Sequence, residues 1–274
     1  MYHRMSTIPK KKADAIETRL LLRMNGKRIL LTIHESPRSI LLYMGGRHLH
    51  CVSAQIIKPN APIGNLMTVD FNTQCSIEND FQRGVDTKAL TCLMLSYISH
   101  NYPFVKDMKF DDVSTRSCGD SEQYVFLSEI SYITTGKTWY ERNFGAYLDP
   151  VSLSEFQEAD QQFQTLKQTL SWSTLTDQYI LQESPFQTLY ESSNTWQDFF
   201  RAVRDRMGME EFCDFMAPWL HSFLQDTMRF QFVHRKYFMP ITSSNDVGYT
   251  IGPYTQGGKS TRRRGVNRRL RRDI

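Results

Sequence analysis

The chain has 274 residues, 40% of them hydrophobic, and a formal net charge of +4. No stretch approaches the roughly 18 consecutive apolar residues that span a membrane, and no apolar secretory segment follows the basic start, so we expect a non-secreted protein without membrane association. The five cysteines are an odd number and include no CxxC pair, which predicts reduced thiols in a reducing, cytosol-like compartment.

The first part of the chain predicts an antiparallel sheet. Two apolar triplets within residues 19–33 flank Asn25-Gly26, a strong β-hairpin signal. Three further apolar runs are separated by glycine- and proline-containing turns and predict strands at residues 40–44, 48–57 and 66–71.

The middle of the chain mixes helices with strands. Apolar residues at helical spacing predict a helix over residues 87–102, and alternating apolar and charged residues predict a strand over 105–113. A second strand is expected at residues 124–133, followed by a short helix near 139–144 that stops at Gly145.

Beyond residue 150 the pattern becomes helical, with helices expected at residues 151–170, 195–207 and 209–232 and with Ser154 as the N-cap of the first. The fold class is therefore α+β, a mixed and mostly antiparallel sheet with flanking helices, plus a C-terminal all-α appendage and a disordered basic tail. The expected divisions are a flexible N-terminus (1–14), an α+β domain (15–150), a helical appendage (151–240), and a linker with the basic tail (241–274).

The net charge is concentrated at the C-terminus. After residue 254 there are eight basic residues and one acid, which gives the tail +7 and leaves −3 for the rest. Clustered arginines neutralise phosphates and release counterions, so the tail predicts salt-dependent nucleic-acid binding; a solubility or localisation tail is the alternative. The basic residues are Lys259, Arg262, Arg263, Arg264, Arg268, Arg269, Arg271 and Arg272.

Other candidate sites are weaker. His48 and His50 share one side of a strand, but no further ligand completes a metal set, so we predict a polar sheet face and no metal site. Asp111 and Asp112 could hold a cation, although such a pair more often ends a solvated strand. The sequence contains no GxSxG, Walker or GxGxxG motif.

Residues 64–148 resemble the GNAT (N-acetyltransferase-like) fold, specifically the GNAT-like proteins of large nucleocytoplasmic DNA viruses. Three segments carry the resemblance. QRGVDTKA (82–89) stands where the family has its R-G-x-G-x-G/A pyrophosphate loop, the strand at 105–113 matches the next core strand, and TGKTWYERNFGA (135–146) is similar to the closing Y-E-K-x-G-F phrase.

The resemblance implies acetyl-CoA as a candidate cofactor and suggests no other. Its pyrophosphate would be held by Arg83, Gly84, Thr87 and Lys88. Tyr140 matches the tyrosine that protonates the leaving thiolate, although it could equally be a packed core aromatic, and Asp70 is the only carboxylate on the strand where a base would lie.

Two departures weaken this site. Asp86 and Lys88 replace two glycines that let backbone N–H groups approach phosphate, and Asp86 adds a negative charge. We therefore expect a viral GNAT-like protein, weakly active or non-catalytic, whose tail binds nucleic acid or acidic virion components in the host cytoplasm or virion. The alternative is an active CoA-dependent N-acyltransferase.

Overall fold

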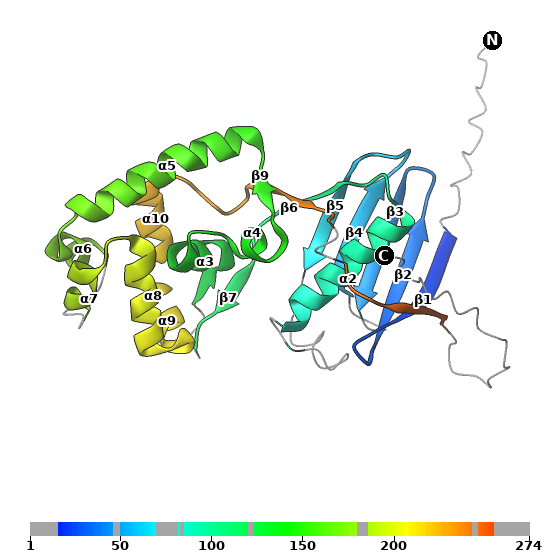
Figure 1. Cartoon of the computed structure of the whole chain (residues 1–274), viewed down its shortest axis with the longest axis horizontal. Coiled ribbons are helices and arrows are strands. Elements are labelled where there is room, and N and C mark those ends of the chain that lie inside the picture. Colours follow the sequence, from blue (N-terminus) through cyan, green and yellow to red (C-terminus); the bar gives the residue numbers. More distant parts are fainter. Residues whose placement is uncertain are drawn as a thin grey trace, which may run out of the picture. The chain divides into compact units, whose positions relative to one another are not determined.

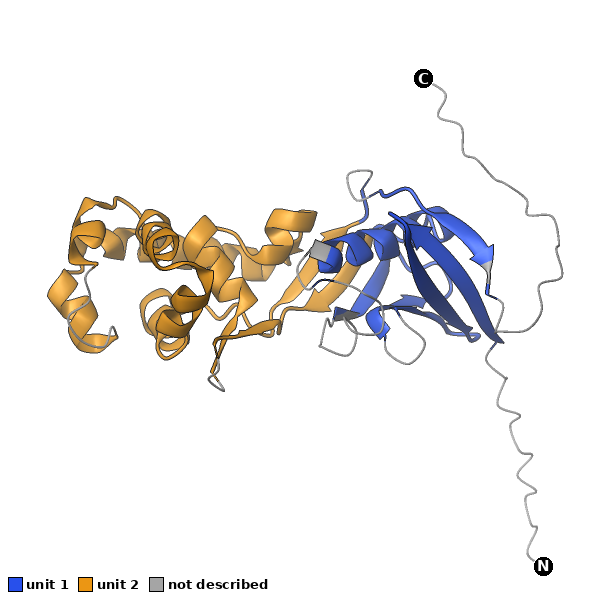
Figure 2. Cartoon of the chain, turned by 90° about the horizontal axis from the view of Figure 1, so that it is seen from below, with its two compact units in different colours: residues 1–106, 241–274 blue, residues 107–240 orange. Residues whose placement is uncertain are grey.

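The computed structural model describes residues 16–45, 50–69, 82, 85–119, 123–179, 186–242 and 246–254. They belong to two compact units, one formed by residues 1–106 and 241–274 and the other by 107–240 (Figure 2). The predicted α+β class, with a large and mostly antiparallel sheet, is confirmed. Among the described helices, none is both long enough and apolar enough to cross a membrane.

The first unit is built on an antiparallel meander in which each strand pairs with the next. The predicted hairpin is confirmed, because Asn25 and Gly26 both have positive φ (50° and 77°), as the tightest hairpin turns require. The strands are β1 (Ile16–Met24), β2 (Lys27–Glu35), β3 (Ser39–Gly45), β4 (His50–Ile57) and β5 (Ile63–Val69).

The chain returns to this sheet near its C-terminus. Strand β11 (Thr250–Pro253) pairs antiparallel with β1, within a segment that the sequence analysis interpreted as a linker. Residues 246–249, just before β11, contact the helix of this unit, since the N–H of Val247 donates to Oγ of Ser96 (2.8 Å).

Helix α2 (Val85–Asn101) lies across one face of the sheet and packs on β4 (Figure 1). It confirms the helix predicted at residues 87–102. The sequence indicated one apolar side, but residues 90–98 are buried all round. Part of the outer side is covered by the returning segment, where the ring of Tyr249 lies 6.4 Å from that of Tyr97.

The strands of the second unit are short. Strand β6 (Asp107–Asp111) pairs antiparallel with β10 (Lys236–Pro240), β9 (Tyr147–Leu148) adds to β10, and β7 (Thr115–Ser117) forms a hairpin with β8 (Tyr124–Phe126).

The predicted strand at 124–133 is wrong beyond Phe126, because the chain turns there into helix α3 (Leu127–Thr135). Residues 128–134 are all buried, so the apolar residues do not mark a single helical face. Gly136, with φ of 75°, ends the helix.

The remaining helices include α4 (Trp139–Phe144), which ends at Gly145 as predicted. In α5 (Pro150–Thr169) the N-cap is Asp149 and not Ser154, because Oδ1 of Asp149 accepts from the N–H groups of Val151 and Ser152. The others are α6 (Trp172–Gln178), α7 (Gln187–Ser192), α8 (Trp196–Met207), α9 (Met209–Met216) and α10 (Leu220–Met228), so the helix expected over 209–232 is divided in two and ends earlier.

The helices of this unit share an aromatic core. The buried ring of Trp196 in α8 lies 5.2 Å from Phe163 in α5 and 5.1 Å from Phe223 in α10. Its Nε1 donates to the backbone oxygen of Phe163 (2.8 Å). The division expected at residue 150 falls inside this unit, which spans residues 107–240: α8 and α10 pack on α3, and α9 and α10 pack on β8.

A disulfide joins Cys118, after β7, to Cys213 in α9, and Cys51 is also disulfide-bonded. Among the described residues the free cysteine is Cys92, which is buried in α2. The prediction of reduced thiols is therefore wrong for Cys51, Cys118 and Cys213, and the cysteines do not support a reducing compartment. Neither the number of cysteines nor the absence of a CxxC pair reports which cysteines meet in the fold.

Candidate functional site

The structure describes only some of the predicted site residues. Asp70, Arg83, Gly84 and the eight basic residues of the tail lie outside the described part of the chain. Thr87, Lys88 and Tyr140 are described, as is the neighbouring Asp86 that departs from the glycine pattern.

The start of α2 is organised around the carboxylate of Asp86. Its Oδ2 accepts from the backbone N–H of Gln82 and from Nζ of Lys27, the latter at 2.8 Å. The Asp86 side chain is only 13% exposed. The Asp86 carboxylate therefore already occupies the hydrogen-bond donor and the positive charge that a bound anion at this helix start would need.

Thr87 and Lys88 occupy the next positions of the same turn. The backbone oxygen of Thr87 accepts from the side-chain Oγ1 of Thr91 (2.8 Å), one turn further along α2, and Lys88 is exposed. Lys27 was missed by the sequence analysis because it lies on β2, 59 residues before Asp86.

Tyr140 lies in a closely packed aromatic cluster in the second unit. Its ring centroid is 4.5 Å from that of Phe110 and 4.9 Å from that of Trp139, and the residue is 5% exposed. Its hydroxyl lies 3.5 Å from Oγ of Ser114. Burial, together with the nearby charge of Asp112, raises the pKa of the Tyr140 hydroxyl. Of the two roles that the sequence left open, this environment favours core packing.

Asp112 lies beside Tyr140 and is 1% exposed, so its interpretation as a solvated strand end is wrong. Its Oδ1 accepts from the N–H of Ser114 (3.1 Å), whereas Oδ2 has no hydrogen-bond partner among the described residues. The hydroxyl of Tyr237, another buried group of this region, is likewise unpartnered there. Burial raises the pKa of Asp112 to about 6, so this carboxyl group can take up a proton near neutral pH.

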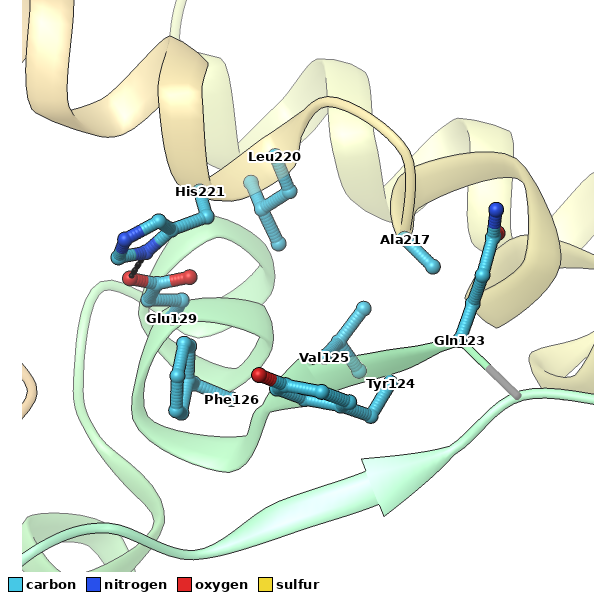
Figure 3. A pocket seen from close by; sticks show the side chains of 8 residues that line it. All are labelled: Gln123, Tyr124, Val125, Phe126, Glu129, Ala217, Leu220 and His221. Carbon is cyan, nitrogen blue, oxygen red and sulfur yellow. Dashed lines mark hydrogen bonds and ion pairs between the residues drawn. The ribbon is translucent and has the colours of Figure 1, made fainter.

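A third group contains Glu129 and His221, which help to line a pocket of about 340 Å³ between the β8–α3 segment and the start of α10 (Figure 3). Nδ1 of His221 lies 2.6 Å from Oε1 of Glu129, and its Nε2 lies 2.8 Å from Nε2 of Gln225. The Glu129 side chain is 3% exposed and that of His221 is 42% exposed. Burial raises the pKa of Glu129, and the hydrogen bond from His221 opposes this effect.

No sequence signal marked this pair. Glu129 fell in a segment predicted as a strand, and His221, which lies 92 residues further along the chain, was interpreted as structural. A correct helix prediction for α3 would have indicated an acidic residue in its first turn, but not its partner.

None of these three regions resembles a metal centre. Within the described ranges, no group of three or more histidine, cysteine, aspartate or glutamate side chains is placed to hold a metal ion. His50 instead lies against Tyr43, with ring centroids 4.6 Å apart. Comparison of the chain with models of protein families, with curated proteins and with solved structures finds no match.

Proposed function

We propose that this chain is a nucleic-acid-binding protein of a large DNA virus, built on a GNAT-like scaffold with a degenerate acyl-CoA site. The competing function is an active CoA-dependent N-acyltransferase. That function would need the start of α2 to receive pyrophosphate and Tyr140 to protonate a leaving thiolate.

The observation that carries the proposal is the carboxylate of Asp86 at the start of α2. An anion at a helix N-terminus is stabilised by backbone N–H groups and by nearby positive charge. Here Asp86 bonds to the N–H of Gln82 and to Nζ of Lys27. An incoming pyrophosphate would meet a negative charge, so these residues do not fit the coenzyme.

Tyr140 supports the same conclusion. A general acid must come within hydrogen-bond distance of the atom that it protonates. The Tyr140 hydroxyl is buried and faces Ser114, and its ring is enclosed by aromatic side chains. We therefore assign Tyr140 to core packing.

The basic tail supplies the binding function. Its charge of +7 is carried by the last 20 residues, while the remainder of the chain is acidic overall at −3. Such a segment binds phosphate backbones through charge and counterion release, without reading base sequence. Acidic virion components offer the same chemistry and are the second class of partner.

Calorimetric titration with acetyl-CoA tests the assignment of the degenerate site. We expect no saturable heat from the wild-type protein at micromolar coenzyme. Asp86→Gly removes the acid and should bind more tightly than wild type, with Asp111→Gly as a control that removes an exposed acid elsewhere. Micromolar binding by the wild type that Gly84→Glu abolishes would contradict the proposal and favour the acyltransferase.

A further inference from the structure

The Figure 3 pocket combines one buried charge with apolar and aromatic walls. Its described lining residues come from two parts of the second unit, and one carboxylate oxygen of Glu129 points toward the middle of the pocket while the other faces His221 (Figure 3). Phe126 and the exposed Tyr124 form one side, with ring centroids 5.6 Å apart. Leu220 lies on the opposite side.

The contacts of Glu129 are all on one side of its carboxylate. Oε1 lies 2.6 Å from Nδ1 of His221, whose Nε2 is in turn 2.8 Å from Nε2 of Gln225. The other oxygen, Oε2, makes no hydrogen bond to the described residues and faces the pocket (Figure 3). The described residues that line the pocket include no lysine or arginine.

A buried carboxylate normally has a cationic partner or a metal ion. The geometry points away from a metal, since the described residues place no third acidic, histidine or cysteine side chain beside Glu129 and His221. Aromatic rings beside a carboxylate are suited to an organic cation, because the ring faces attract positive charge and the rest of the ring surface contacts alkyl groups. The volume of about 340 Å³ lies at the lower end of the range for small-ligand pockets.

We propose that this pocket binds the positively charged end of an alkylammonium group. The carboxylate oxygen of Glu129 that faces the pocket accepts from the cation, Phe126 and Tyr124 contact its alkyl chain, and His221 positions the carboxylate. A free amine and a lysine side chain of another protein present the same chemistry.

The test is a saturation-transfer NMR titration of the full-length protein with three probes. Butylamine represents a free amine, Nα-acetyl-lysine N-methylamide represents a lysine side chain, and the norleucine analogue has nearly the same shape without the charge. We expect at least one of the two cations to bind at least tenfold more tightly than the norleucine analogue. Tighter binding of butylamine identifies a free amine, and tighter binding of the lysine probe identifies a side chain.

Two variants connect the binding to the pocket. Glu129→Gln keeps the acceptor for His221 but removes the charge, and should weaken binding of the cation at least tenfold; Glu158→Gln, on the exposed surface of α5, is the matched control. Tyr124→Ala changes a residue that is 54% exposed and should weaken binding at least threefold without unfolding the protein. Equal binding of the norleucine analogue, unchanged binding by Glu129→Gln, or no binding of either cation at millimolar concentration would overturn the proposal.

Discussion

Nζ of Lys27, the first residue of β2, lies 2.8 Å from Oδ2 of Asp86 in the first turn of α2. This ion pair ties the helix to the sheet of the first unit, and the same carboxylate accepts from the N–H of Gln82. The contact that argues against coenzyme binding therefore also stabilises the fold.

Replacing Asp86 should separate the contribution of the ion pair to stability from that of the hydrogen bond to Gln82. Asp86→Ala removes both the ion pair and the bond to Gln82, and should lower the free energy of unfolding by about 1–2 kcal/mol. Asp86→Asn keeps an acceptor for Gln82 and should cost less. Urea denaturation of the three proteins measures the difference, and equal stability of all three would show that the carboxylate has no structural role.

The buried carboxyl group of Asp112 predicts a pH-dependent stability. Its pKa of about 6 in the folded protein exceeds the ordinary value of 3.8. Its stabilising contribution is therefore fully present below about pH 4 and is lost as the pH rises through about 6, at a cost of about 3 kcal/mol.

The variant Asp112→Asn removes this ionisation and keeps an acceptor for the N–H of Ser114. We expect it to be more stable than wild type at pH 8 by up to about 3 kcal/mol, and about equally stable near pH 4. Denaturation curves at the two pH values measure this. A wild-type protein that is the more stable of the two at pH 8 would show that the charged carboxylate has a partner.

The disulfide between Cys118 and Cys213 should contribute strongly to the stability of the second unit. It joins residues 95 apart in the sequence, and closing a loop of that size in the unfolded chain contributes about 4–5 kcal/mol on entropic grounds. The double variant Cys118→Ala/Cys213→Ala should unfold at correspondingly lower urea concentration. Mass spectrometry of unreduced digests should find the two cysteine peptides linked, and unlinked peptides in protein purified without reductant would contradict the assignment.

Local signals in the sequence predicted much of the secondary structure. Asn25-Gly26 predicted the first hairpin because few residues other than glycine and asparagine adopt its positive φ values. The helix at 139–144 was predicted for a similar reason, since Gly145 ends it with φ of 65°. Its start is fixed by a capping box between Thr138 and Glu141.

The wrong predictions concern residues whose secondary structure or burial depends on tertiary packing. Helix α3 was mistaken for a strand because burial on nearly all sides removes the helical periodicity of its apolar residues. Asp112 is buried by side chains from other elements, which its strand-end position could not reveal. Both candidate-site contacts, Lys27 with Asp86 and Glu129 with His221, join residues 59 and 92 positions apart, beyond the reach of any local motif.

The central claim is that the chain binds nucleic acid through its basic tail, and a salt titration tests it most directly. Fluorescence anisotropy of a labelled duplex should be measured from 50 to 200 mM salt with the full chain and with a protein truncated after Tyr254. If six or more of the eight basic residues contact phosphates, the affinity of the full chain should fall about a thousandfold or more over this range. The truncated protein should not bind measurably; binding that is independent of salt, or that survives the truncation, would contradict the account.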